Sequence, residues 1–376
     1  MSGVEASART VLSPETRLAW LRLIRSENVG PVTFRQLLNR FGGAEAALEA
    51  LPELAGRGGS KRTVRVASAE AAEVELASAG RMGARFVCLG EPDYPPILRL
   101  VDGPPPVLAV MGDAAVFTRP TVAFVGARKA SAAGAKLTRM LAQDVGEAGY
   151  AIVSGLARGI DTAAHEASLP TGTVGVFAGG LDRPYPNENR PLMRRIVDGG
   201  GALVSEMPFG WEPRAVDFPR RNRIVVGLAS GVLVVEAATR SGSLISARLA
   251  GEMGRLVFAV PGSPLDPRSA GTNALLKDGA TLVTEAADIL EAMRPLDERM
   301  RTDVLREPFA PPTDDEEPAQ SDRDRILQAL GTTPTSLDDL LDHARVAPGT
   351  LQLVLLELDL AGRLERHPGG GISLLF

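Results

Sequence analysis

The stretch VAFVGARKASAAG, residues 122–134, decides the fold of this 376-residue chain. An uninterrupted apolar run leads into a glycine turn and then into small residues typical of a helix start. The stretch IVSGLARGIDTAAH, residues 152–165, repeats the arrangement. Apolar runs without polar alternation indicate strands buried on both faces, and their alternation with helices indicates a parallel sheet. The two stretches therefore predict an α/β core with a doubly wound, mostly parallel sheet.

Further runs of the same kind extend this pattern from about Thr121 to Met293. They are TVGVFA, ALVSE, VLVVEA, LVFAVPG and TLV. Several runs end in glycine, at Gly126, Gly155, Gly179 and Gly262. Ligands of such sheets bind beyond the carboxyl ends of the strands, so we expect the binding edge at these glycines.

The flanking regions differ from the core in composition. Residues 1–80 predict a small domain of short amphipathic helices. Residues 81–293 hold the core, and the proline-rich segment 81–116 is interpreted as an irregular lead-in to it. Residues 294–322 predict an acidic, proline-containing linker. Residues 323–376 predict three helices followed by a hairpin, which is the pattern of a winged helix.

Composition restricts the kind of function. The single cysteine, Cys88, excludes a disulfide framework and suits a reducing cytoplasm. With three scattered histidines, no metal cluster is expected, and no cofactor or catalytic set is assigned. We expect no membrane span, because no run of about 18 uncharged apolar residues occurs, and no signal peptide at the N-terminus. The net charge of −5 is unusual for a nucleic-acid binder, so any such site needs local positive charge.

Positive charge gathers at the turns that follow the first two strands. Arg128 and Lys129 stand where the N-terminus of the next helix should expose N–H groups that bind anions. The glycine spacing is not GxGxxG, so phosphate binding and a plain strand–helix turn with solvated cations both remain open. The second turn adds four candidates: Ser154, Gly155, Arg158 and Gly159.

A third cluster lies in FPRRNRIVVGLAS, residues 218–230. It contributes the candidates Phe218, Arg220, Arg221, Asn222 and Arg223. The guanidinium groups, which we expect to be exposed, would form a strong phosphate patch at a helix start. Phe218 is suited to stack on an unpaired base. The alternative is a surface arginine cluster that pairs with a local acid such as Asp217.

Two further positions have both a functional and a structural interpretation. Ser241, Gly242 and Ser243 precede a helix and could cradle an anion, although Ser243 could also be only the N-cap of that helix. His165 suggests catalysis, but it has no evident nucleophile beside it, so a packed or hydrogen-bonded histidine is favoured.

Taken in order, these motifs resemble the DNA-processing protein A family, called DprA or Smf. The matching text runs from about Asp93 to Ile289: DYPPILRLVDGPPPVL, VAFVGARKASAAG, IVSGLARGIDTAAHEASL, GVFAGGLDRPYPNEN, LVSEMPFG, FPRRNRIVVGLA, VVEAATRSGSLISARLA, FAVPG and GTNALLKDGA. The resemblance implies an extended Rossmann-like fold with an N-terminal domain like a sterile alpha motif and a C-terminal winged helix. It places the phosphate pocket at Arg128, Arg158, Arg220–Arg223 and Ser241–Ser243.

The resemblance also implies a function and partners. It implies a homodimer that binds incoming single-stranded DNA in natural transformation, and we expect a carrier of DNA rather than an enzyme. It further implies displacement of single-strand-binding protein and loading of the RecA recombinase.

Two other functions remain as alternatives. A phosphoribohydrolase of similar fold would carry a PGGxGTxxE motif, but here Ser243 replaces its threonine and Ser246 its catalytic glutamate, with Glu236 offset. A transcription regulator would read duplex DNA with its winged helix. The acidic second helix of that region, with Asp338 and Asp339, argues against this role.

Overall fold

The computed structural model describes residues 11–60, 62–300, 317–367 and 370–375. Their contacts form two compact units, which we describe separately. The sheet unit contains residues 11 and 75–300, and the helical unit contains residues 12–60, 62–74, 317–367 and 370–375. In the described residues, no helix is both long and apolar enough to cross a membrane.

The sheet unit is built on one large sheet with the strand order β1-β2-β6-β5-β4-β3-β7-β8-β9. The strands are β1 (Ala84–Cys88), β2 (Val107–Gly112), β3 (Thr121–Val125), β4 (Ala151–Ser154), β5 (Thr173–Val176), β6 (Ala202–Ser205), β7 (Gly231–Val234), β8 (Leu256–Ala259) and β9 (Thr281–Leu282). From β6 to β9 all neighbours are parallel. All seven runs predicted as strands are confirmed, and so is the Rossmann-like fold class.

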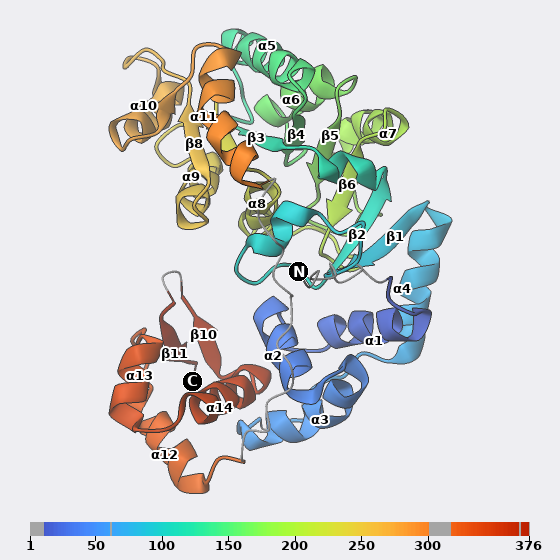
Figure 1. Ribbon diagram of the computed structural model, residues 1–376, viewed down its shortest axis with the longest axis vertical. Coiled ribbons are helices and arrows are strands. Elements are labelled where there is room, and N and C mark those ends of the chain that lie inside the picture. Colours follow the sequence, from blue (N-terminus) through green and yellow to red (C-terminus); the bar gives the residue numbers. More distant parts are fainter. Residues whose placement is uncertain (1–10, 61, 301–316, 368–369, 376) are drawn as a thin grey trace, which may run out of the picture. The chain divides into compact units, whose positions relative to one another are not determined.

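Helices cover the central strands on both faces. They are α5 (Ala132–Glu147), α6 (Ile160–Ser168), α7 (Arg190–Asp198), α8 (Asp217–Gly227), α9 (Gly242–Glu252), α10 (Ala270–Lys277) and α11 (Ala286–Met300). In Figure 1, α5 and α6 lie on one side of these strands and α8 and α9 on the other. Phe124, Leu233 and Phe258 are fully buried beneath α5, α6 and α11. This apolar core fixes the strand ends that carry the site.

The segment 81–116 is not an irregular lead-in, and that expectation was wrong. It supplies β1 and β2, which pair antiparallel with each other and extend the sheet beyond β6. The prolines lie in the connection between these two strands, which also contains the 3-10 helix η1 (Pro96–Leu100). They therefore interrupt no ladder, and the apolar runs RFVC and VLAVM could still form strands.

Both ends of the predicted linker, residues 294–322, are helical, so that expectation was wrong there. Helix α11 continues to Met300, with Pro295 inside it, and the next helix starts at Gln320. Residues 301–316 lie outside the described residues, as do residues 1–10, where no signal peptide was expected.

The helical unit joins the first and last regions of the chain. Its elements are α1 (Pro14–Arg25), α2 (Pro31–Phe41), α3 (Ala44–Arg57), α12 (Gln320–Ala329), α13 (Leu337–Ala344), α14 (Pro348–Leu360), β10 (Leu364–Arg366) and β11 (Ile372–Leu374), while α4 (Ala69–Arg81) begins in it and ends in the sheet unit. Three helices and a hairpin confirm the predicted winged helix.

Helix α14 is buried from Leu351 to Leu360 except at Gln352 and Asp359. Its apolar residues pack into the winged-helix core and against α3, and even Glu357 is only 1% exposed, paired with Arg323 at 2.8 Å. The Asn28 side-chain amide donates to the Leu360 carbonyl at 2.9 Å. A Cβ atom added to Gly58 would lie 2.0 Å from the Glu357 carbonyl oxygen. The N-terminal helices and the third helix of the winged helix therefore share one interface.

Candidate functional site

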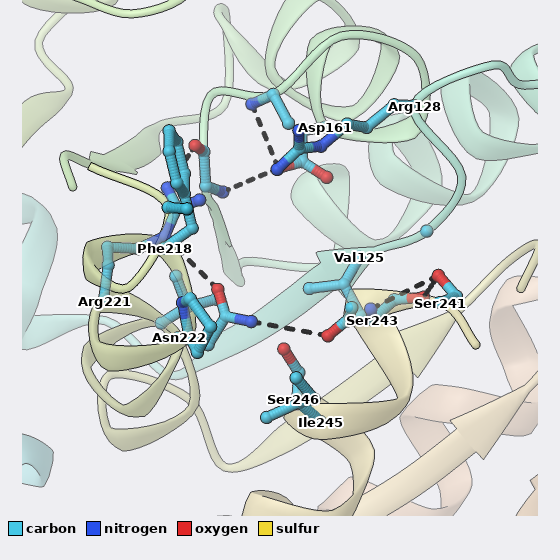
Figure 2. Close-up of a pocket in the computed structure, with 17 residues that line it drawn as sticks. Val125, Arg128, Asp161, Phe218, Arg221, Asn222, Ser241, Ser243, Ile245 and Ser246 are labelled. Atoms are coloured by element: carbon cyan, nitrogen blue, oxygen red, sulfur yellow. Dashed lines mark hydrogen bonds between the residues drawn. The ribbon is translucent and has the colours of Figure 1, made fainter. Parts of the chain in front are cut away.

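A cavity of about 440 Å³ opens at the carboxyl ends of β3 and β4, beside α8 and α9 (Figure 2). The chain runs from β3 outward to β6 on one side and from β7 to β9 on the other, so the cavity lies at the switch point of the sheet. Eight of the predicted candidates line it: Arg128, Gly155, Phe218, Arg221, Asn222, Ser241, Gly242 and Ser243. Six do not: Lys129, Ser154, Arg158, Gly159, Arg220 and Arg223.

Arg221 is buried, so the expectation that it is exposed was wrong. It is 6% exposed, and its Nη1 donates to the carbonyls of Gly155 and Val176, at the ends of β4 and β5. A Cβ atom on Gly155 would lie 2.6 Å from this guanidinium, which is why glycine stands there. Burial lowers the pKa of Arg221 to about 10, against the opposing effect of Asp161, so it stays charged at neutral pH.

Asp161, which also lines the cavity, completes this buried arrangement. Its Oδ2 accepts from the backbone N–H groups of Gly155 and Ala157, both at 3.1 Å. Burial raises the pKa of Asp161, while the charge of Arg221 and these hydrogen bonds oppose the shift. Gly159 has φ +78°, and a Cβ atom there would lie 2.3 Å from the Ala127 carbonyl oxygen. The hydrogen bonds to Asp161 and the close backbone approach at Gly159 therefore fix the SGLARG loop, residues 154–159.

The other two arginines of the FPRRNR segment share one acid. Arg220 and Arg223 both pair with Glu206, a 9% exposed residue after β6, with 3.1 Å between Arg220 Nε and the carboxylate. Arg223 is only half-exposed, which also corrects the expectation that it is exposed. Asp217, the acid considered in the sequence, instead accepts from Trp211 Nε1 and the Arg214 backbone. Pairing with an acid therefore occurs, but with Glu206.

The sequence leaves both phosphate binding and a plain strand–helix turn open for the N-terminus of α5, and the structure favours the plain turn. Glu236, which follows β7, accepts hydrogen bonds from the Ser131 backbone N–H at 2.9 Å and from the Ser131 hydroxyl. The Gly134 N–H is capped by Ser131 Oγ at 2.8 Å. A carboxylate of the chain thus already satisfies the positive end of this helix.

The N-terminus of α9 forms the polar wall of the cavity. Ser241 is its N-cap, not Ser243, and accepts from the Ser243 N–H at 3.4 Å. The two hydroxyl oxygens lie 2.7 Å apart, and Asn222 Nδ2 reaches the Gly242 carbonyl at 3.4 Å. Figure 2 shows Ser241, Ser243 and Ser246 on the α9 side of the cavity and Asn222 on the α8 side. Hydroxyl and backbone N–H groups at a helix start are suited to bind an anion.

The exposed positive charge comes from the turn after β3. Arg128 and Lys129 are both exposed, and the Arg128 guanidinium lies 5.3 Å from the centre of the Phe218 ring. Arg240, also exposed, directly precedes the α9 cap and was missed, although a cation next to a helix start was a usable signal. Arg158 is exposed but pairs with Glu188. Ser154 is fully buried and donates to the Phe124 carbonyl at 2.6 Å.

His165 is packed, as expected. Its Nδ1 lies 2.7 Å from Thr173 Oγ1, and the ring is fully buried. Burial, together with the nearby charge of Arg221, lowers the pKa of His165 to about 3, so the ring is neutral at physiological pH.

Fold and site together define a Rossmann-like α/β protein with an anion-suited switch-point cavity and an appended winged helix. Residues 85–294 match the family model described as DNA recombination-mediator protein A, residues 14–78 match a DprA-like N-terminal HHH domain, and residues 310–370 match a DprA winged helix domain. The chain therefore belongs to the DNA-processing protein A family, also called DprA or Smf. The N-terminal helices, expected to resemble a sterile alpha motif, match the HHH description.

Named relatives agree with this assignment. Protein Smf of Escherichia coli is 39% identical over 287 residues, covering 75% of each chain. The crystal structure of DNA processing protein A from Streptococcus pneumoniae has a TM-score of 0.59 and 33% identity, covering 75% of this chain and 98% of that one. DNA processing protein A from Helicobacter pylori, whose structure is described by its single-stranded DNA binding mode, has a TM-score of 0.51 and 30% identity, covering 56% and 96%.

Proposed function

We propose that this protein binds single-stranded DNA at the switch-point cavity and carries it without catalysing a reaction on it. The observation that carries the proposal is the meeting of exposed Arg128 with the hydroxyl-rich start of α9 around one cavity. Such groups bind phosphate by charge-assisted hydrogen bonds and helix N–H groups. The Helicobacter pylori relative, whose structure is described by its single-stranded DNA binding mode, supports the same ligand class.

The contacts assigned to the strand are those that line the cavity or border it with exposed charge. They are Arg128, Lys129, Phe218, Asn222, Ser241, Gly242, Ser243 and, newly, Arg240. Arg221 and Gly155 also line the cavity, but together with Gly159 they hold the turns in place and are not assigned to the strand. Phosphate contacts position a strand without reading its bases, so little sequence preference follows.

The arrangement gives no support to the phosphoribohydrolase alternative. Ser246 stands where the hydrolase glutamate would be, and the Glu236 carboxylate is occupied by Ser131. Asp161, the acid that lines the cavity, is tied to two backbone N–H groups. Release of free base from AMP-like nucleotides by the purified protein would restore that alternative.

The biological role that we propose comes from the family. The protein would act in the cytoplasm as a homodimer during natural transformation. It would displace single-strand-binding protein from incoming DNA and load the RecA recombinase. No cofactor or metal is part of this proposal.

Arg128→Ala tests the pocket directly. Loss of one charge-assisted phosphate contact should weaken single-strand affinity about tenfold. It should also lower the slope of log affinity against log salt by about one. Fluorescence anisotropy across a salt series, with single-stranded and blunt duplex DNA in parallel, measures both quantities.

Arg139→Ala is the matched control, because Arg139 is an exposed arginine of the same unit on α5, paired with Glu166. It should leave affinity and salt slope unchanged. Equal losses of affinity in the two variants would mean that binding depends on the overall positive charge and not on this cavity. Equal affinity of the wild-type protein for duplex and single strand at moderate salt would count against the single-strand function.

A further inference from the structure

An aromatic pair stands beside the proposed phosphate contact. The ring of Tyr185 packs on Phe218, with 5.4 Å between ring centres and 62° between the planes. Phe218 in turn lies under the Arg128 guanidinium. The three side chains come from the connection after β5, from α8 and from the turn after β3. A guanidinium and two rings thus contact one another in a row, in which Arg128 and Phe218 line the cavity and the two rings meet edge to face.

Tyr185 is the exposed member of this row. Its side chain is 52% exposed, whereas Phe218 is half-buried. Within the part of the chain that the structure describes, Tyr185 is the only aromatic residue in the exposed class. Tyrosine is enriched at interfaces because its ring is apolar while its hydroxyl can stay in water, so this exposed ring offers a surface to a ligand.

The segment that carries Tyr185 is anchored on both sides. Before it, Asp182 Oδ1 accepts from the Gly210 N–H at 2.8 Å. After it, the Asn189 side-chain amide, only 7% exposed, donates to the Leu156 carbonyl at 2.8 Å. The loop on either side of Tyr185 is therefore held in place before any ligand arrives, which lowers the entropy that binding costs.

We propose that Tyr185 is the platform on which a nucleobase of the bound strand stacks, with Phe218 as its support. Arg128 already lies over Phe218, so the open aromatic surface of the row belongs to Tyr185. This proposal rests on the single-strand function and moves base stacking from Phe218, where the sequence suggested it, to Tyr185. Stacking is tolerant of base identity because every base has a π-face. The strand would then be held at two points. Arg128 would bind a phosphate, and Tyr185 would stack on a base next to that phosphate.

Binding of normal and abasic single strands of equal length by the full-length protein separates the two contacts. Tyr185→Ala should weaken binding of the normal strand about tenfold and leave binding of the abasic strand unchanged. Tyr185→Phe, which keeps the ring, should retain wild-type affinity. Arg128→Ala should weaken both strands. Met140→Ala, which removes an equally exposed apolar side chain on α5, should affect neither.

Two results would overturn the platform. One is an equal loss on normal and abasic strands in Tyr185→Ala, which would mean that the ring acts on the backbone or on the loop. The other is no loss on the normal strand. Failure of the single-strand function itself would look different, because the wild-type protein would then bind neither strand. Circular dichroism should show the same fold for all variants, since the substituted side chains are exposed.

Discussion

The carboxyl edge of the sheet and helix α14 are both elements with which proteins bind nucleic acids. In this molecule they differ in how far they are exposed to solvent. At the sheet edge, Arg128 and Lys129 stay exposed beside a cavity. The third helix of the winged helix, which reads DNA in many relatives of that fold, is buried from Leu351 to Leu360 except at Gln352 and Asp359. The exposure of charged side chains therefore indicates where DNA binds better than the presence of a DNA-binding fold does.

The same contrast appears inside the sheet edge itself. Arg128 and Arg221 both line the cavity, yet one guanidinium is exposed and the other holds strand-end carbonyls together. We therefore expect Arg128 to govern binding and Arg221 to govern stability. The three predictions below test this division and the division between the two units.

The largest expected effect belongs to Arg221→Met. It leaves Asp161 buried without its neighbouring charge and two strand-end carbonyls without a donor. Breaking a buried pair in this way costs about 3–5 kcal/mol of the free energy of unfolding. The chain has two tryptophans, and Trp211 lies in the sheet unit. Urea unfolding in a Trp20→Phe background, followed by Trp211 fluorescence, measures the loss in that unit.

Arg128→Ala in the same background should change the free energy of unfolding by no more than about 0.5 kcal/mol. If Arg221→Met instead kept full stability and lost DNA affinity, the buried guanidinium would contact DNA after all.

Gly58→Ala should have the second largest effect, and it should fall on the helical unit. The added methyl group meets the Glu357 carbonyl oxygen at the interface of α3 and α14. Overpacking of this kind costs about 1–3 kcal/mol. Trp20 fluorescence in a Trp211→Phe background reports the helical unit, and single-strand affinity should not change.

Gly56→Ala is the matched control, because a Cβ atom two residues earlier meets nothing within 4 Å. It should be neutral or slightly stabilising. Identical behaviour of the two variants would contradict the tight interface. Duplex binding gained by Gly58→Ala would show that α14 retains a face able to read DNA once it is uncovered.

The smallest expected effect concerns pH. His165 has a folded-state pKa of about 3, well below its ordinary value of 6.5. The unfolded chain therefore takes up a proton as the pH falls below about 6.5, while the folded chain does not. Stability that is present above this pH should decrease towards lower pH, by at most about 1.4 kcal/mol per unit.

Urea unfolding at pH 7 and pH 5.5, followed by Trp211, should show this loss in the sheet unit. His165→Gln removes the titrating group, so its unfolding free energy should change less between the two pH values, whatever its absolute stability. An unchanged pH dependence in this variant would exclude His165 as the source.

Much of the fold was predictable because apolar runs report burial directly. The parallel strands, the winged helix and the edge that carries the cavity all followed from run length and from the position of the turns. Strands β1 and β2 were not predicted because the prolines of the connection between them indicate irregular backbone for the whole segment. The all-round apolar pattern of α14, in LQLVLLELDL, signalled a second buried face but could not say what covers it.

The site was predictable in residue type but not in depth. Sequence shows that FPRRNR is rich in cations, but not that Arg221 points inward or that Glu206 lies between Arg220 and Arg223. Those facts depend on strands distant in the chain, as does the carboxylate of Glu236 at the start of α5. Tyr185 gave no signal, because an isolated tyrosine between two prolines reads as a loop residue.

The joint interface of the first and last regions has a consequence for synthesis of the chain on the ribosome. Asn28 and its hydrogen-bond partner Leu360 are 332 positions apart. At about 5–20 residues per second, α3 must wait roughly 15–65 seconds after translation before α14 emerges to cover it. Helix α3 leaves the ribosome among the first elements, with part of its apolar side in water. During this interval the uncovered apolar side of α3 would be a binding site for a chaperone on the nascent protein.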